Sequence, residues 1–112
     1  MVNRHRGEIE VELGDRRWTL CLTLGALAEL ESAYGDEDLL SLAERFERGA
    51  IGARDAIRII GAGLRGAGNE VRDAEVAALT VEGGAAGYIR IVADLLQATF
   101  APAGEENSPA GN

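Results

Sequence analysis

The sequence EIEVELGDRRWTLCL, residues 8–22, decides the N-terminal fold of this 112-residue chain. In residues 8–13, glutamate alternates with isoleucine, valine and leucine, which is the period of a strand with one buried face. Residues 17–22 alternate in the same way after the turn-forming pair Gly14-Asp15. The stretch therefore predicts a β-hairpin with one apolar and one polar face.

The two faces of this hairpin differ in chemistry. On the second strand, Trp18, Leu20 and Leu22 share the apolar face. The polar face carries glutamates on one strand and arginines on the other, so we expect Glu12 and Arg17 to lie close together. An exposed ion pair of this kind contributes little free energy, and we expect it to set the register more than the stability.

Beyond the hairpin, apolar residues recur at helical spacing, beginning with Leu24, Leu27 and Leu30. Thr23 is the expected N-cap of this first helix and Gly35 its expected stop. The expected helices are 24–34, 38–48, 53–64, a short fourth helix capped by Asp73, and a fifth after Gly83-Gly84 that carries Tyr88 to Phe100.

The predicted fold class is α+β and mainly α, with an N-terminal β-hairpin followed by a bundle of four to five short helices. We expect one domain over residues 1–100. Residues 101–112 contain both prolines of the chain and no apolar periodicity, which predicts a disordered C-terminal tail.

The composition excludes several classes of protein. There are 19 acidic and 11 basic residues, and a net charge of −8 argues against nonspecific nucleic-acid binding. One histidine and one cysteine, Cys21, cannot form an internal disulfide or a four-ligand zinc site. We find no export signal and no apolar run near the roughly 20 residues of a membrane span. A cytoplasmic protein without a membrane partner is the expectation.

One string looks like a cofactor motif. Gly61, Gly63 and Gly66 form a G-x-G-x-x-G pattern after an apolar run, as in a dinucleotide-binding turn. The expected helix after the pattern and the strand that would complete a βαβ unit are both missing. The alternative is that the small residues Gly61, Ala62 and Gly63 let the third helix pack closely against a neighbour, or let it fray into a turn. A small nucleotide-binding enzyme is therefore the third and last of our hypotheses.

No catalytic, cofactor-binding or metal-binding residues are predicted. His5 has no nucleophile at a recognisable spacing, and Cys21 has no neighbouring base to activate it. A stretch rich in acids is open to three interpretations: a docking surface for a basic partner, a site for a hard cation, or a solvated face with a helix cap. Its acids are Glu29, Glu31, Asp36, Glu37 and Asp38.

Residues 3–8 (NRHRGE), residues 17–31 (RWTLCLTLGALAELE) and Tyr34-Gly35 resemble the tail-assembly protein family of gene transfer agents, phage-like particles encoded in bacterial chromosomes. The resemblance continues less specifically and covers about residues 3–96. It implies a protein described in two ways, as a tail tube component and as a tail assembly chaperone that escorts the tape-measure protein.

The leading hypothesis is a cytoplasmic, non-enzymatic tail assembly chaperone that binds the tape-measure protein, with self-association left open. Its predicted partner-binding residues are Trp18, Leu20, Leu22, Glu29, Glu31, Asp36, Glu37 and Asp38. The second hypothesis is a structural tail tube component. It ranks lower because tube subunits are expected to build a ring from larger β-sandwich-like sheets, and only two strands are predicted here.

Overall fold

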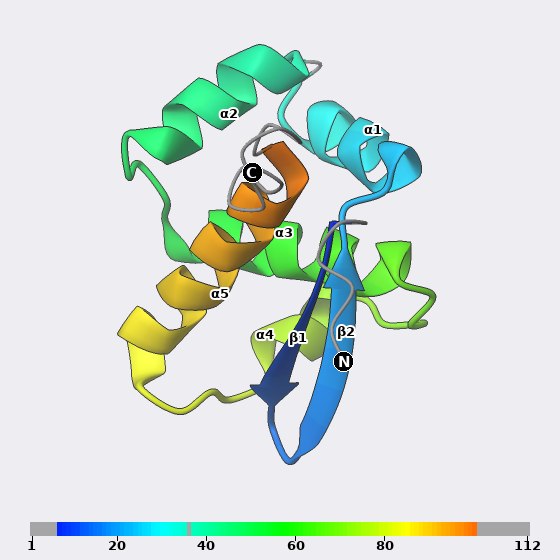
Figure 1. Cartoon of the computed structure of the whole chain (residues 1–112), viewed down its shortest axis with the longest axis vertical. Coiled ribbons are helices and arrows are strands. Elements are labelled where there is room, and N and C mark those ends of the chain that lie inside the picture. The colour runs from blue at the N-terminus through cyan, green and yellow to red at the C-terminus, as the bar shows by residue number, and fades with distance from the viewer. Residues whose placement is uncertain (1–6, 36, 101–112) are drawn as a thin grey trace, which may run out of the picture.

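The computed structural model describes residues 7–35 and 37–100. Within these ranges, a two-stranded antiparallel hairpin is followed by five helices (Figure 1). The elements are β1 (Glu8–Leu13), β2 (Arg16–Cys21), α1 (Leu24–Ala33), α2 (Leu39–Glu47), α3 (Ala53–Gly66), α4 (Asp73–Ala77) and α5 (Gly84–Phe100). The predicted fold class, α+β and mainly α with an N-terminal hairpin, is confirmed. The tail predicted for residues 101–112 lies outside the described residues.

The hairpin has the register that the alternation predicts. Ile9 pairs with Leu20 on the apolar face, and Glu12 pairs with Arg17 on the polar face. The Arg17 guanidinium lies 3.1 Å from a Glu10 carboxylate oxygen and 3.6 Å from one of Glu12. All three side chains are exposed, so these ion pairs add little to the free energy of unfolding.

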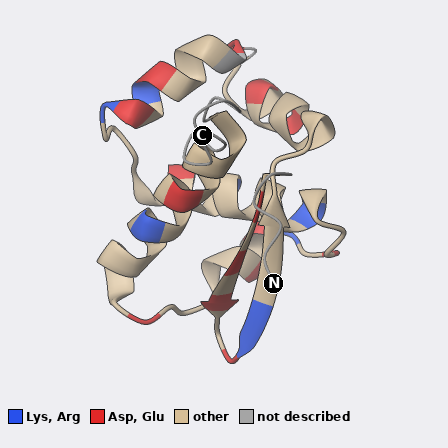
Figure 2. Ribbon diagram, viewed as in Figure 1, with Lys and Arg blue, Asp and Glu red and all other residues tan. Residues whose placement is uncertain are grey.

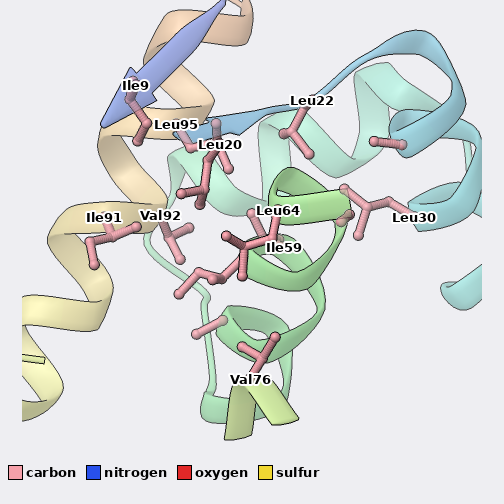
Figure 3. Close-up of a cluster of buried hydrophobic side chains, with 14 of the residues drawn as sticks. Ile9, Leu20, Leu22, Leu30, Ile59, Leu64, Val76, Ile91, Val92 and Leu95 are labelled. Atoms are coloured by element: carbon pink, nitrogen blue, oxygen red, sulfur yellow. The ribbon is translucent and has the colours of Figure 1, made fainter. Parts of the chain in front are cut away.

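The apolar face of the hairpin packs on α3 and α5. Leu20 is 0% exposed and lies among side chains from both helices, including Leu64 of α3 and Leu95 of α5 (Figure 3). The indole N–H of Trp18 donates a hydrogen bond of 3.1 Å to the carbonyl of Leu13. Burial of this kind contributes roughly 25 cal/mol per Å² of apolar surface, which makes the hairpin and the two helices one core.

Capping residues set the ends of the first two helices. The Thr23 hydroxyl accepts a 3.1 Å hydrogen bond from the Ala26 N–H at the start of α1, and Asp38 accepts one of 2.8 Å from the Ser41 N–H at the start of α2. Gly35 has φ +73 just after α1, a conformation that favours glycine. These caps confirm the predicted limits of both helices to within one residue.

The predicted start of α4 was wrong by one residue. Asp73 is the first helical residue, and the N-cap is Arg72, whose backbone N–H donates to Glu75 at 2.7 Å. The Asp73 carboxylate instead lies 3.0 Å from the Arg65 guanidinium on α3. A tertiary ion pair has therefore replaced the local cap.

Candidate assembly surfaces

The glycine pattern lies inside α3. Gly61, Gly63 and Gly66 are helical, and α3 extends two residues past the predicted end at Leu64. A Cβ atom on Gly63 would lie 2.7 Å from a Leu95 methyl, and one on Gly66 would meet the backbone carbonyl of Cys21. The interpretation as a close-packing motif is confirmed. The strand-to-helix turn that a dinucleotide needs is not what this pattern forms.

A buried carboxylate joins α1, α2 and α3. Asp55 is 8% exposed and accepts hydrogen bonds from the Tyr34 hydroxyl and, at 2.8 Å, from the Gly52 N–H. An Arg45 nitrogen lies 3.8 Å from Asp55, and Arg58 lies over the Tyr34 ring. Burial, assisted by Asp55, raises the pKa of Tyr34 to about 12. This cluster fixes the three helices relative to one another.

Arg65 makes a second clamp, from the end of α3. Its guanidinium donates to the Val71 carbonyl and to Asp73, both at 3.0 Å, and it forms an ion pair with Glu29 of α1. The hydrogen bond that Arg65 donates to Glu29 contributes most to raising the pKa of Arg65. Glu29 is thus occupied within the fold, although its side chain is partly exposed.

The other predicted acids make different contacts and do not act as one group. Glu31 is half-buried, Glu37 lies 4.0 Å from Arg45, and Asp38 caps α2. Asp36 lies outside the described residues. Among residues 7–35 and 37–100, no three acidic, histidine or cysteine side chains are arranged to hold a metal ion. The interpretation of Asp38 as a helix cap is confirmed, and a docking role for the stretch stays a prediction.

The apolar members of the predicted partner surface, Trp18, Leu20 and Leu22, are all buried in the core. By contrast, Glu29 and Glu31 lie on α1, and Glu37 and Asp38 lie just before α2; Figure 2 shows acidic residues on the ribbon of both helices. The eight residues therefore do not form one exposed patch. Their part in binding a partner stays a prediction, and for these three it would require the hairpin to separate from the helices.

An apolar groove at the junction of α3, α4 and α5 is not predicted by the sequence. Its volume is about 360 Å³, and none of its lining side chains is charged. The lining residues are Leu13, Ile51, Gly52, Ala53, Ala56, Ile57, Ile60, Val76, Ala77, Ala85, Tyr88 and Ile89. They come from four segments distant in sequence, so no local sequence pattern predicts the groove.

Leu24 also lies outside the core in which its spacing predicts it. Helical spacing put it with Leu27 and Leu30, but Leu24 is 79% exposed. The buried face of α1 is centred on Ala26 and Leu30, and Leu24 lies about 120° around the helix from Leu30. The exposed face of α1 contains Leu24, Gly25, Ala28 and Ser32. Such a face is unusual for a surface helix because it holds no charged residue at its centre.

Residues 6–102 match the family described as phage tail tube protein, GTA-gp10. The chain belongs to this family. The match covers most of the chain and confirms the predicted relationship to gene transfer agent tail proteins. No curated protein and no solved structure matches the chain.

The GTA-gp10 family corrects the leading functional hypothesis. A tail assembly chaperone was predicted, but the family is described as a tail tube protein, which is the second hypothesis. The chaperone hypothesis had been favoured because only two strands were predicted. The strand count was right for the described residues, and the inference from it was wrong. None of the helices in the described part of this GTA-gp10 chain has the length and hydropathy of a membrane span.

Proposed function

We propose that this protein is a structural subunit of the tail tube of a gene transfer agent particle, and that it has no enzymatic activity. The observation that carries the proposal is the family match over residues 6–102. The chemistry of the described residues supports it. The one cysteine is a poor nucleophile, because burial and the nearby Glu8 raise the pKa of the Cys21 thiol.

The architecture suits a subunit that must keep one shape while it is stacked many times. The Asp55 and Arg65 clusters tie α1, α2, α3 and the segment before α4 together with directional polar contacts. The described residues contain a single two-stranded sheet. We therefore propose that helices supply most of the contacts between subunits.

The proposed partners are other proteins of the tail and further copies of this chain. The tape-measure protein, predicted as a partner from the resemblance, is included among them. The net charge of −8 would keep the subunits soluble and mutually repelling until specific contacts form, which fits assembly in the cytoplasm. The same charge disfavours direct contact with nucleic acid.

Quantitative mass spectrometry of purified particles tests this function. Particles from producing cells are compared with those from cells in which the gene is deleted and with the soluble fraction of the same lysate. The proposal predicts many copies of the chain per tailed particle, in fixed ratio to the other tail proteins. Tailed particles that lack the chain, from cells that contain it in quantity, would overturn the proposal.

A further inference from the structure

The described surface offers two uncharged features on different sides of the molecule. The first is the exposed face of α1, on which Leu24 projects with 79% of its surface exposed. The second is the apolar groove of about 360 Å³ beside the start of α5. In Figure 1, α1 begins on the right, at the end of β2, and α5 begins at the lower left. An apolar projection and an apolar recess thus lie on distinct surfaces of one chain.

We propose that the exposed face of α1 in one copy docks into this groove of the next copy, with Leu24 entering the groove. The inference rests on the proposed tube function, and it names the partner and the two surfaces. A cavity of about 150 Å³ already holds a benzene molecule, so the groove has room for a leucine side chain and its neighbours. The occupant is a second copy of this chain.

The chemistry of the α1 face favours this occupant over a charged one. Two acids border this face. Glu29 forms an ion pair with Arg65, and Glu31, seven residues after Leu24, is half-buried. The small residues Gly25 and Ala28 beside Leu24 allow close approach of another backbone. The groove lining has no charged side chain that would be left unpaired on contact.

The geometry of the contact fits a tube. Because the α1 face and the groove are different surfaces, each copy that uses one keeps the other vacant. Such a head-to-tail contact propagates and gives a ring where the rotation closes, whereas a contact of one surface with itself stops at a dimer. Leu40 provides an internal comparison, since it is 70% exposed but on α2, with Glu44 one turn further on.

Disulfide trapping between copies tests the contact on the purified full chain. In a Cys21→Ser background, a Leu24→Cys variant is mixed with an Ala85→Cys variant that carries a tag of different size, and the mixture is oxidised gently. The control mixture pairs Leu40→Cys with Ala86→Cys, which is exposed but absent from the groove lining. The inference predicts a mixed disulfide several-fold above the control and above either symmetric product.

Yields equal to the control, or symmetric Leu24 disulfides in excess, would overturn the inference. In sedimentation experiments, Leu24→Asp should weaken self-association roughly tenfold to a hundredfold, since a buried leucine contributes about that factor to an association constant. Leu40→Asp should leave it unchanged, and equal loss in both variants would also contradict the contact. If the chain is present in particles but the purified chain forms no mixed disulfide, the proposed contact is refuted and the tube function stands. If the mixed disulfide forms but particles lack the chain, the tube function is refuted.

Discussion

Gly66→Ala should destabilise the protein although alanine is the better helix former. The added Cβ would meet the Cys21 backbone carbonyl and, at 3.3 Å, the Ala26 Cβ. The Cys21 backbone cannot change rotamer as a flexible side chain can, so α3 must move away from β2. Overpacking of this kind costs about 1–3 kcal/mol, and the gain in helix propensity offsets at most about 1 kcal/mol. These two terms leave a net loss between zero and about 3 kcal/mol, and because the clash is with backbone we expect about 1–2 kcal/mol in the free energy of unfolding.

Gly25→Ala is the matched control for this prediction. Gly25 is also helical, but a Cβ there would lie 3.9 Å from the Thr23 hydroxyl oxygen, an ordinary contact. This variant should be unchanged or more stable by up to about 1 kcal/mol. Urea unfolding followed by circular dichroism measures both, and thermal unfolding should show Gly66→Ala lower by roughly 4–16 °C. Equal stability of the two variants would refute the close packing of α3 on β2.

Three further predictions concern the core and the Asp55 cluster. Leu20→Ala, at a side chain with 0% exposure, should cost about 2–5 kcal/mol in urea unfolding, whereas Leu40→Ala, at 70% exposure, should stay within about 0.5 kcal/mol of the wild type. Asp55→Asn should cost about 1–3 kcal/mol, because it weakens hydrogen bonds from Tyr34 and Gly52 to a buried acceptor; a change confined to the chemical-shift spectrum would contradict this. The pKa of Tyr34 is raised from 10.0 to about 12, so the folded state favours the neutral phenol. The free energy of unfolding should therefore be unchanged below pH 10 and fall as the pH rises toward 12. Tyr34→Phe should remove the part of this alkaline loss that comes from the phenol.

The hairpin and the first two helices could be predicted from sequence because their signals are local. Alternation with period two fixes which residues of the strands face inward, and one side chain at each helix start supplies the cap. Thr23 and Asp38 act through N–H groups three residues away. Such contacts depend on nothing distant in the chain.

The role of Gly61, Gly63 and Gly66 depended on contacts distant in sequence. The same pattern can admit a pyrophosphate or a neighbouring helix, and only the positions of Leu95 and Cys21 distinguish the two. The exposure of Leu24 is a similar case. Apolar residues of α1 occur at helical spacing on more than one face, and only tertiary packing determines which face is buried. The observed start of α4 differs from the predicted one because Asp73 binds Arg65 instead of capping the helix.

The groove and the function were beyond sequence patterns for different reasons. The groove is assembled from Leu13, the start of α3, α4 and the start of α5, so its existence is a property of the packed fold. The number of predicted strands describes architecture, and architecture does not distinguish a chaperone from a tube subunit. The family match, and not the physical pattern, corrected the functional hypothesis.

Electron cryomicroscopy of the tail tube in purified particles tests the proposed structural role most directly. We predict that the repeating density holds this chain's fold, a hairpin with α3 and α5 across its apolar face, in stacked rings, with α1 of each copy against the groove of its neighbour. A tube whose repeating subunit has a different fold, with no density for this chain along its length, would contradict the assignment of the protein as a tube subunit.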